Sequence, residues 1–393
     1  MPAAVAYDPF DYAIHEDPYP VYERLRDEAP AYWNPTRGFW ALSRFADVMG
    51  ALADHETYSS VGGVSLERSS GHTPPMIIAM DPPRQAKLRR LVSRAFTPRR
   101  VAEMEPQVRA LTAKHLEPLL ARGRGDFVQD FSAKLPMDVI STMLGVPEAD
   151  QDMLRGWADV LLHREPGRGE VTDEGKRGAA NLVGYFVKDI ARRRARPGDD
   201  LISGLLAAEV DGERLTDEEI IGFCFLLVIA GNETTTKMLG NAGHLLAAHP
   251  DQRRALAADP ALIPGAVEEV LRFDSSTQML ARVLTRDVAL HGAHLAAGQR
   301  VLMLIGSANR DERVFGPTAA AFDIFRRPEQ QAFFGHGVHV CLGASLARLE
   351  GRVALEELHR RAPEYEVDVA GLRRVHSANV RGYSHVPIRF ASR

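Results

Sequence analysis

A helical pattern of more than thirty residues, over 216–249, constrains the fold of this chain more than any other feature. The segment Thr216-Asp-Glu-Glu219 has the form of a capping box, which marks a helix start, and Pro250 closes the pattern. Helical periodicity predicts further helices over 20–28, 46–53, 84–96, 101–121, 127–144, 148–162, 172–196, 201–209, 261–273 and 343–361. Strand-like stretches are few and short, at 39–43, 281–284, 288–290, 300–305 and 386–390. We therefore expect a mainly α fold with small β-sheets.

The bulk properties of the chain exclude several classes of protein. No Gly/Ser-rich linker, composition break or internal repeat divides the 393 residues, which favours one large domain over 1–393. A net charge of −4 argues against a dedicated nucleic-acid binder. Two distant cysteines do not make a disulfide scaffold and favour a reducing compartment. The N-terminus has no recognisable signal peptide, and the apolar run at 220–230 is shorter than the roughly 20 residues that span a bilayer. We expect a cytoplasmic protein that binds neither nucleic acid nor membranes.

The loop at 334–348 is the most informative segment for chemistry. Gly335, Gly337 and Gly343 allow tight turns and a close approach of the backbone to a flat partner. Cys341 lies where an Ala- and Leu-rich helix begins, and a helix N-terminus lowers the pKa of a thiol and supplies N–H donors to its sulfur. This environment suits a thiolate that ligates iron.

Two other interpretations of Cys341 compete with iron ligation. A lone cysteine is usually a buried structural residue, but three glycines and two histidines around a core cysteine would lack a purpose. A zinc site built from His336, His339 and Cys341 lacks a credible fourth ligand, because Cys224 lies in the apolar helical run at 223–229. We predict that Cys224 is a core residue.

The middle of the long helical pattern, at 230–236, contains Gly, Asn and three Thr, which are poor helix formers. Gly231 has no side chain, and the hydroxyl of Thr234 is able to draw hydrogen bonds away from the helical ladder. The resulting groove would admit O₂ and water, and Glu233 would relay protons into it. The alternative is a solvent-exposed kink in the helix.

The cysteine loop resembles the haem-binding signature of the cytochrome P-450 monooxygenases. The shared pattern is a Phe, glycines, a basic residue two positions before the Cys, and then Gly and an Ala-containing helix. The resemblance implies haem b (iron protoporphyrin IX) as cofactor, with Cys341 as the proximal iron ligand and His339 hydrogen-bonded to a haem propionate. Phe334 and Gly343 are implied to belong to the haem-binding loop.

The segment in the long helix is similar to the oxygen-binding helix of the same family. Its Ala/Gly-Gly-x-acid-Thr pattern is matched by Ala230, Gly231, Glu233 and Thr234. The resemblance implies that the first two residues lie beside the haem and that the acid and the Thr deliver protons during oxygen activation. Family members that use hydrogen peroxide directly tend to lack this pair, so its presence favours a monooxygenase.

Glu269-Val-Leu-Arg272 resembles the Glu-x-x-Arg pair of the family. In the family this pair is tied to an arginine in the segment before the cysteine loop, and it stabilises the haem-binding core. The third partner is predicted to be Arg326, with Arg327 as the alternative.

Two more arginines are implied to neutralise haem propionates, Arg282 and Arg89. The family expects a His four residues before the second of these, but this chain has Gln85, an amide without charge, and its contact with a propionate stays open. The other basic residues of 84–100 form either a solvated face or a docking face for an acidic electron donor.

The resemblance also implies where the substrate binds. The residues expected to face it are mostly apolar: Leu226, Ile229, Ala230, Gln278 and Met279. The Gly-, Ser- and Pro-rich loop at 59–80 is expected to cover the site, and Val380 and Arg381 to close it. An inward-pointing Arg381 would favour an anionic substrate.

The activity implied is insertion of one oxygen atom of O₂ into a small, largely apolar organic substrate, as a hydroxylation or oxidative dealkylation. Electrons would come from an external ferredoxin and ferredoxin reductase, because the family pattern fills the chain from about Pro18 to Phe390 and leaves no fused flavin or ferredoxin domain. A peroxide-driven haem peroxygenase and a non-catalytic haem sensor or carrier are the alternatives. Pocket residues vary freely in this family, so the substrate itself is not specified.

Overall fold

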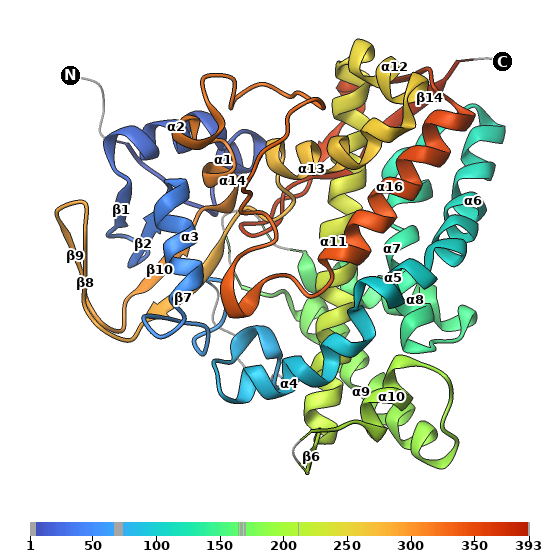
Figure 1. The fold of residues 1–393 in the computed structure, drawn as a ribbon, viewed down its shortest axis with the longest axis horizontal. Coiled ribbons are helices and arrows are strands. Elements are labelled where there is room, and N and C mark those ends of the chain that lie inside the picture. The colour runs from blue at the N-terminus through green and yellow to red at the C-terminus, as the bar shows by residue number, and fades with distance from the viewer. Residues whose placement is uncertain are drawn as a thin grey trace.

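The computed structural model describes residues 5–391 except 67–73, 164, 166, 167, 169 and 211. It is mainly helical, with the strands within 31–42 and 280–303 (β1, β2, β7, β8, β9 and β10) on one side of the molecule and most helices on the other (Figure 1). The helices are α1 (Tyr12–Glu16), α2 (Tyr19–Glu28), α3 (Phe45–Ala53), α4 (Arg84–Val92), α5 (Pro98–Glu103), α6 (Glu105–Arg122), α7 (Leu135–Leu144), α8 (Glu148–Leu162), α9 (Asp173–Ala195), α10 (Leu201–Ala207), α11 (Asp217–Ala248), α12 (Pro250–Ala258), α13 (Ile263–Phe273), α14 (Ile305–Ala308), α15 (Glu312–Phe315) and α16 (Ala344–Arg361). This architecture agrees with the predicted mainly α fold with small sheets.

The largest sheet has five strands in the order β1-β2-β10-β7-β3. Its strands are β1 (Ala31–Asn34), β2 (Phe39–Leu42), β3 (Tyr58–Ser59), β7 (Leu280–Leu284) and β10 (Arg300–Met303). A second sheet joins β11 (Tyr365–Val367), β14 (Pro387–Phe390) and β4 (Arg124–Asp126), and three two-stranded ribbons pair β5 (Glu209–Val210) with β6 (Glu213–Arg214), β8 (Val288–Leu290) with β9 (Ala293–Leu295), and β12 (Arg373–Arg374) with β13 (Tyr383–His385). Only β10 and β2 pair in parallel, so the main sheet is built mostly from antiparallel neighbours.

Helix α11 crosses the centre of the molecule, and α16 packs along it (Figure 1). Its predicted capping box is present, because Thr216 Oγ1 accepts from the Glu219 backbone N–H at 3.2 Å and the Glu219 carboxylate accepts from the Thr216 N–H at 3.0 Å. The helix is long and apolar enough to cross a membrane, but most of its apolar stretch is buried inside the fold, as in the core helix of a soluble protein. The other described helices do not meet the same length and hydropathy criteria.

Several helices differ from the predictions. Pro250 closes α11 as predicted, but it also begins α12, which was not predicted, since proline fits the first turn of a helix and disfavours a helical residue before it. The segment predicted as one helix over 101–121 is split between α5 and α6 at Met104. The segment predicted as one helix over 127–144 opens with a π-type turn, Val128–Ser132, before α7.

Candidate active site

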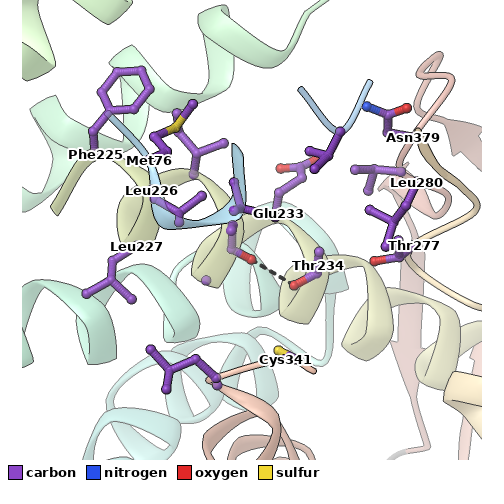
Figure 2. Close-up of a pocket in the computed structure, with 18 of the residues that line it drawn as sticks. Met76, Phe225, Leu226, Leu227, Glu233, Thr234, Thr277, Leu280, Cys341 and Asn379 are labelled. Atoms are coloured by element: carbon purple, nitrogen blue, oxygen red, sulfur yellow. Dashed lines mark hydrogen bonds between the residues drawn. The ribbon is translucent and has the colours of Figure 1, made fainter. Parts of the chain in front are cut away.

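One large cavity of about 1180 Å³ lies between the middle of α11 and the cysteine loop. In Figure 2, Cys341 lies on the opposite side of this space from Glu233 and Thr234. Two segments that are more than one hundred residues apart in the sequence therefore face the same interior space, as the two sequence motifs implied.

The cysteine loop holds Cys341 at the start of α16. The Cys341 backbone N–H donates to the Phe334 carbonyl at 2.7 Å, which closes the loop. Gly335 and Gly337 have φ angles of +71° and +68°, in the left-handed region that favours glycine. A side chain on Gly337 would also place its Cβ 2.8 Å from the Leu52 carbonyl oxygen. Both glycines are therefore required by the path of the loop.

Burial is the main influence on the Cys341 thiol. Burial raises its pKa, while the Gly343 backbone N–H and the guanidinium groups of Arg89 and Arg348 act in the opposite direction. The sequence predicted that the helix N-terminus lowers the pKa of the Cys341 thiol, but in the structure the effect of burial is larger. A cationic partner bound to the sulfur is therefore needed to hold the thiolate form. Cys224 is fully buried in the core, as predicted. No cluster of three His, Cys, Asp or Glu side chains that could hold a metal occurs among the described residues, which argues against the zinc site.

Three basic side chains face the cavity near Cys341. Arg282 is 3 % exposed, and burial lowers its pKa to about 10. Burial, with the nearby charges of Arg282 and Arg89, lowers the pKa of His339 to about 4, and its Nε2 is hydrogen-bonded to the Ser60 hydroxyl at 3.1 Å. Neither arginine has a carboxylate partner within the described part of the chain: Arg282 donates to the Ala281 carbonyl and Arg89 to the Val340 carbonyl. Arg282 is buried and Arg89 half-buried, and a cation in such a place is costly without a direct ion pair, so this end of the cavity is prepared for an anion.

Gln85 of α4 forms a hydrogen bond to the backbone of the cysteine loop. It is 1 % exposed, and its Nε2 donates to the Val338 carbonyl at 2.8 Å. The amide at this position therefore holds the backbone of the loop that carries Cys341.

On the opposite side of the cavity, α11 is helical throughout 230–236, and several residues of this stretch are buried, which argues against the alternative of a solvent-exposed kink. The Thr234 hydroxyl donates to the Ala230 carbonyl at 2.9 Å (Figure 2), so this carbonyl is shared with a side chain. The missing side chain of Gly231 makes room for Ile140 of α7, whose Cδ1 would lie 2.9 Å from an added Cβ. Gly231 therefore has a packing role, and it also lines the cavity, so its predicted role in opening space for O₂ stays a prediction.

Glu233 has a partner that the sequence analysis missed. Lys237, one turn further along α11, places its Nζ 3.0 Å from a carboxylate oxygen of Glu233. The lysine is 6 % exposed, and its stem packs against the position of Gly382. A charged residue on a helix normally indicates a solvated face, so only the tertiary structure reveals this ion pair.

A buried charge cluster joins α13 to the segment before the cysteine loop. Arg272, which is fully buried, donates two hydrogen bonds of 2.7 and 2.8 Å to Glu269 and three more to the carbonyls of Asn309, Ala319 and Ala321. Arg326 Nε lies 3.5 Å from Glu269, whereas Arg327 bonds only to nearby carbonyls. Arg326 is therefore the third partner, and Arg327 is not.

The remaining cavity wall is largely apolar. Its apolar residues come from α11, from the covering loop, from β7 and from the C-terminal segment, and include Val64, Met76, Ile77, Phe225, Leu226, Leu227, Ile229, Ala230, Met279, Leu280 and Val380. The described part of the loop at 59–80 thus contributes to the wall as expected; its residues 67–73 lie outside the described residues.

Two predicted substrate contacts are wrong. Gln278 turns away from the cavity: its amide accepts from the Tyr22 hydroxyl at 3.2 Å and donates to the Ser275 carbonyl at 2.7 Å. Arg381 also points away, because it is paired with the buried Asp274 at 2.7 Å. No guanidinium from this position is available to bind an anionic substrate.

Comparison with known proteins matches these features to one family. The family model for cytochrome P-450 matches residues 261–366, which include Glu269, Arg272 and Cys341. A Mycobacterium tuberculosis protein that carries the name cytochrome P-450 123 is 48% identical over 98% of this chain and 97% of its own length. The chain is a cytochrome P-450.

Other relatives extend this assignment. The vitamin D(3) 25-hydroxylase of Pseudonocardia autotrophica is 38% identical to this cytochrome P-450 over 98% of the chain and 97% of the relative. A crystal structure of a Bacillus megaterium protein in complex with testosterone superposes with a TM-score of 0.90 and 36% identity, covering 96% of this chain and 98% of that one. The protein is thus an enzyme of the monooxygenase family, whose cofactor is haem.

The residues around the cavity fit a haem group. A haem carries two propionates, and the cavity supplies the unpaired cations Arg282 and Arg89 together with His339 near Cys341. The sulfur of Cys341 faces the same space, and the glycines of its loop allow close approach of a flat ring. This chain therefore supplies cations for the propionates, a sulfur ligand for the iron and a cavity for the ring.

We expect Arg282→Leu to weaken haem retention. The substitution removes a buried cation that forms no direct ion pair within the described residues, and a charge-assisted hydrogen bond contributes about 1.5–3 kcal/mol. Haem transfer to apomyoglobin should become about tenfold to a hundredfold faster. Arg286→Leu, which alters an exposed arginine just beyond β7, should leave the rate unchanged. Equal rates in all three proteins would contradict a propionate contact at Arg282.

Proposed function

We propose that this protein inserts one oxygen atom of O₂ into a small, largely apolar organic molecule and releases the other atom as water. The reaction consumes two electrons and two protons. The observation that carries the proposal is the arrangement of Cys341 on one side of a single cavity and of Glu233 with Thr234 on the other (Figure 2). When bound, haem supplies a thiolate-ligated iron that activates O₂.

The side chains of α11 move and hold protons in this scheme. Thr234 presents its hydroxyl at the cavity wall, anchored by its hydrogen bond to the Ala230 carbonyl. Glu233 lines the same wall and is held by Lys237. The ammonium group of Lys237 defines where the Glu233 carboxylate rests, so that protons pass through Glu233 to the hydroxyl of Thr234.

The substrate class follows from the wall and from the relatives. Apolar side chains surround most of the cavity, and the named relatives act on vitamin D(3) or bind testosterone. An apolar alicyclic compound is therefore the best-supported substrate, oxidised by hydroxylation or oxidative dealkylation.

Electrons would be supplied by a ferredoxin and its reductase in the cytoplasm. Arg94, Arg99 and Arg100 are exposed at the end of α4 and the start of α5. They lie on the chain segment that follows Arg89, which bonds to the cysteine loop. An acidic protein docked there would be drawn by complementary charge to the side of the molecule nearest Cys341.

Thr234→Val tests the role of α11. The variant keeps the shape of the side chain and removes the hydroxyl, so we expect haem binding to persist while product formed per electron pair falls about tenfold or more. The lost electrons should appear as hydrogen peroxide, measured with a surrogate ferredoxin system and testosterone as a trial substrate. Thr236→Val is the matched control, because that hydroxyl donates to the Ser132 carbonyl inside the core.

Two outcomes would contradict the proposal. If Thr234→Val formed as much product per electron pair as wild type, the Thr234 hydroxyl would not take part in proton delivery. Rapid turnover of wild-type protein with hydrogen peroxide in place of O₂ and reductant would indicate a peroxygenase instead.

A further inference from the structure

One patch of the cavity wall is polar. Thr277, just before β7, and Asn379, in the C-terminal segment, line the cavity on the same side as Leu280 (Figure 2). The Asn379 Oδ1 is buried and has no hydrogen-bond partner among the described residues, and the amide nitrogen turns toward the space between the walls in Figure 2. The Thr277 hydroxyl likewise makes no side-chain hydrogen bond to any residue of the described structure.

The backbone under this polar patch is fixed. Thr277 and Val380 form an antiparallel bridge, and the Gln278 N–H donates to the Asn379 carbonyl at 2.8 Å. Ser377 Oγ accepts from the backbone N–H groups of Asn379 and Val380 at 3.3 and 3.2 Å. The two segments that carry the polar groups are thus joined to each other directly.

Buried charges brace the same two segments from behind. Asp274 and Arg381, 4 % and 5 % exposed, form an ion pair at 2.7 Å, and the nearby cations lower the pKa of Asp274 despite its burial. Asn241 of α11 donates to the Asp274 carbonyl at 2.9 Å. The polar patch is therefore preorganised, and little ordering is required when a ligand binds to it.

The part of the wall that lies opposite the polar patch is apolar. Phe225, Leu226 and Leu227 of α11, with Met76 of the covering loop, lie across the cavity from the polar patch (Figure 2). A ligand between these four side chains and the polar patch has an apolar surface on one side and hydrogen-bonding groups on the other.

We propose that Thr277 and Asn379 bind an oxygen atom of the substrate, a ketone or hydroxyl carried at a position other than the carbon that is oxidised. The Asn379 amide nitrogen and the Thr277 hydroxyl line the cavity without a protein partner, so a substrate oxygen is able to accept a hydrogen bond from them, whereas a hydrocarbon leaves both unpaired. This inference rests on the proposed monooxygenase function and narrows its substrate class to oxygenated apolar compounds. The two residues determine specificity and orient the substrate; neither takes part in the proton transfers.

The test compares matched ligands on the haem-containing protein. Testosterone with androstane, and dodecan-2-one with dodecane, are titrated against wild type while the shift of the haem Soret band is followed. We expect each oxygenated ligand to bind more tightly than its hydrocarbon. In Thr277→Val and Asn379→Leu the oxygenated ligands should each lose about fivefold to tenfold in affinity, with the hydrocarbons unchanged or tighter. Both variants preserve side-chain size, and the leucine removes an unpaired buried oxygen, so neither is expected to disturb folding.

Control variants separate hydrogen bonding from shape. Thr277→Ser retains the hydroxyl and should keep the preference for the oxygenated ligand. Val380→Ala, on the same wall, should change the affinity of both members of a pair alike. The inference is overturned by a wild-type protein that shows no preference in either pair or binds none of the four ligands, or by variants that weaken both members of a pair equally. Loss of the thiolate signature in the spectrum of reduced, CO-bound wild type would instead overturn the proposed function.

Discussion

Cys341→His removes the red-shifted Soret band of the reduced, CO-bound protein and abolishes oxygenation of substrate. The shift arises from thiolate ligation, and imidazole nitrogen does not reproduce the electron donation of sulfur. Haem can remain bound in the variant, because Arg282, His339 and Arg89 are unchanged. The absorbance spectrum of the CO complex, measured together with the haem content, gives the result directly.

Cys224→Ala is the control for this experiment. Cys224 is fully buried in the core, and burial raises its pKa strongly, so it is an unreactive thiol. Its replacement should leave the band in place. A red-shifted band in Cys341→His, or its loss in Cys224→Ala alone, would contradict the assignment of Cys341 as the iron ligand.

Arg272→Met is expected to lower the free energy of unfolding by about 3–5 kcal/mol, the loss typical when one partner of a buried ion pair is removed. The variant leaves the Glu269 carboxylate, 1 % exposed, with only the more distant Arg326 as a cation. It also strips the carbonyls of Asn309 and Ala319 of their donor. Because these carbonyls belong to the segment before the cysteine loop, we also expect poor haem incorporation. Denaturant unfolding and the haem content of purified protein measure the two effects.

Arg99→Met provides the matched comparison. It breaks an ion pair with Glu103 at 3.1 Å in which the arginine side chain is 90% exposed. Such exposed pairs contribute less than about 1 kcal/mol. If the two substitutions reduced stability to the same extent, the buried cluster would not be what holds this part of the fold.

The parts of the molecule that were predictable from sequence have local causes. The capping box of Thr216 and Glu219 starts α11, and a long apolar periodicity continues it, so its bounds were predicted to within one residue at each end. The glycines of the cysteine loop serve local turns, and their spacing is visible in the sequence. The loop and the middle of α11 also carry the family resemblance, which is why both sides of the cavity were identified.

The incorrect predictions concern side chains whose direction is set by partners far away in the sequence. Arg381 was expected to close the cavity, but it pairs with Asp274, a buried residue that lies 107 positions earlier in the sequence. Gln278 occupies the same peptide stretch as two lining residues, and its amide is drawn away by Tyr22 of α2. The short strands β1, β4 and β11 were not predicted, because three or four residues give too little alternation to distinguish them from loops.

Because Lys237 holds the carboxylate of Glu233, a residue that does not line the cavity is able to influence proton delivery. Gly382 precedes β13 and is not among the residues that line the cavity, yet an added Cβ there would lie 2.5 Å from Lys237 Cβ and 2.9 Å from its Cγ. Any larger residue at this position would displace the lysine and, with it, the resting place of the carboxylate. Variation at a residue that does not line the cavity is therefore able to alter how efficiently electrons are used, and libraries restricted to pocket residues would never sample it.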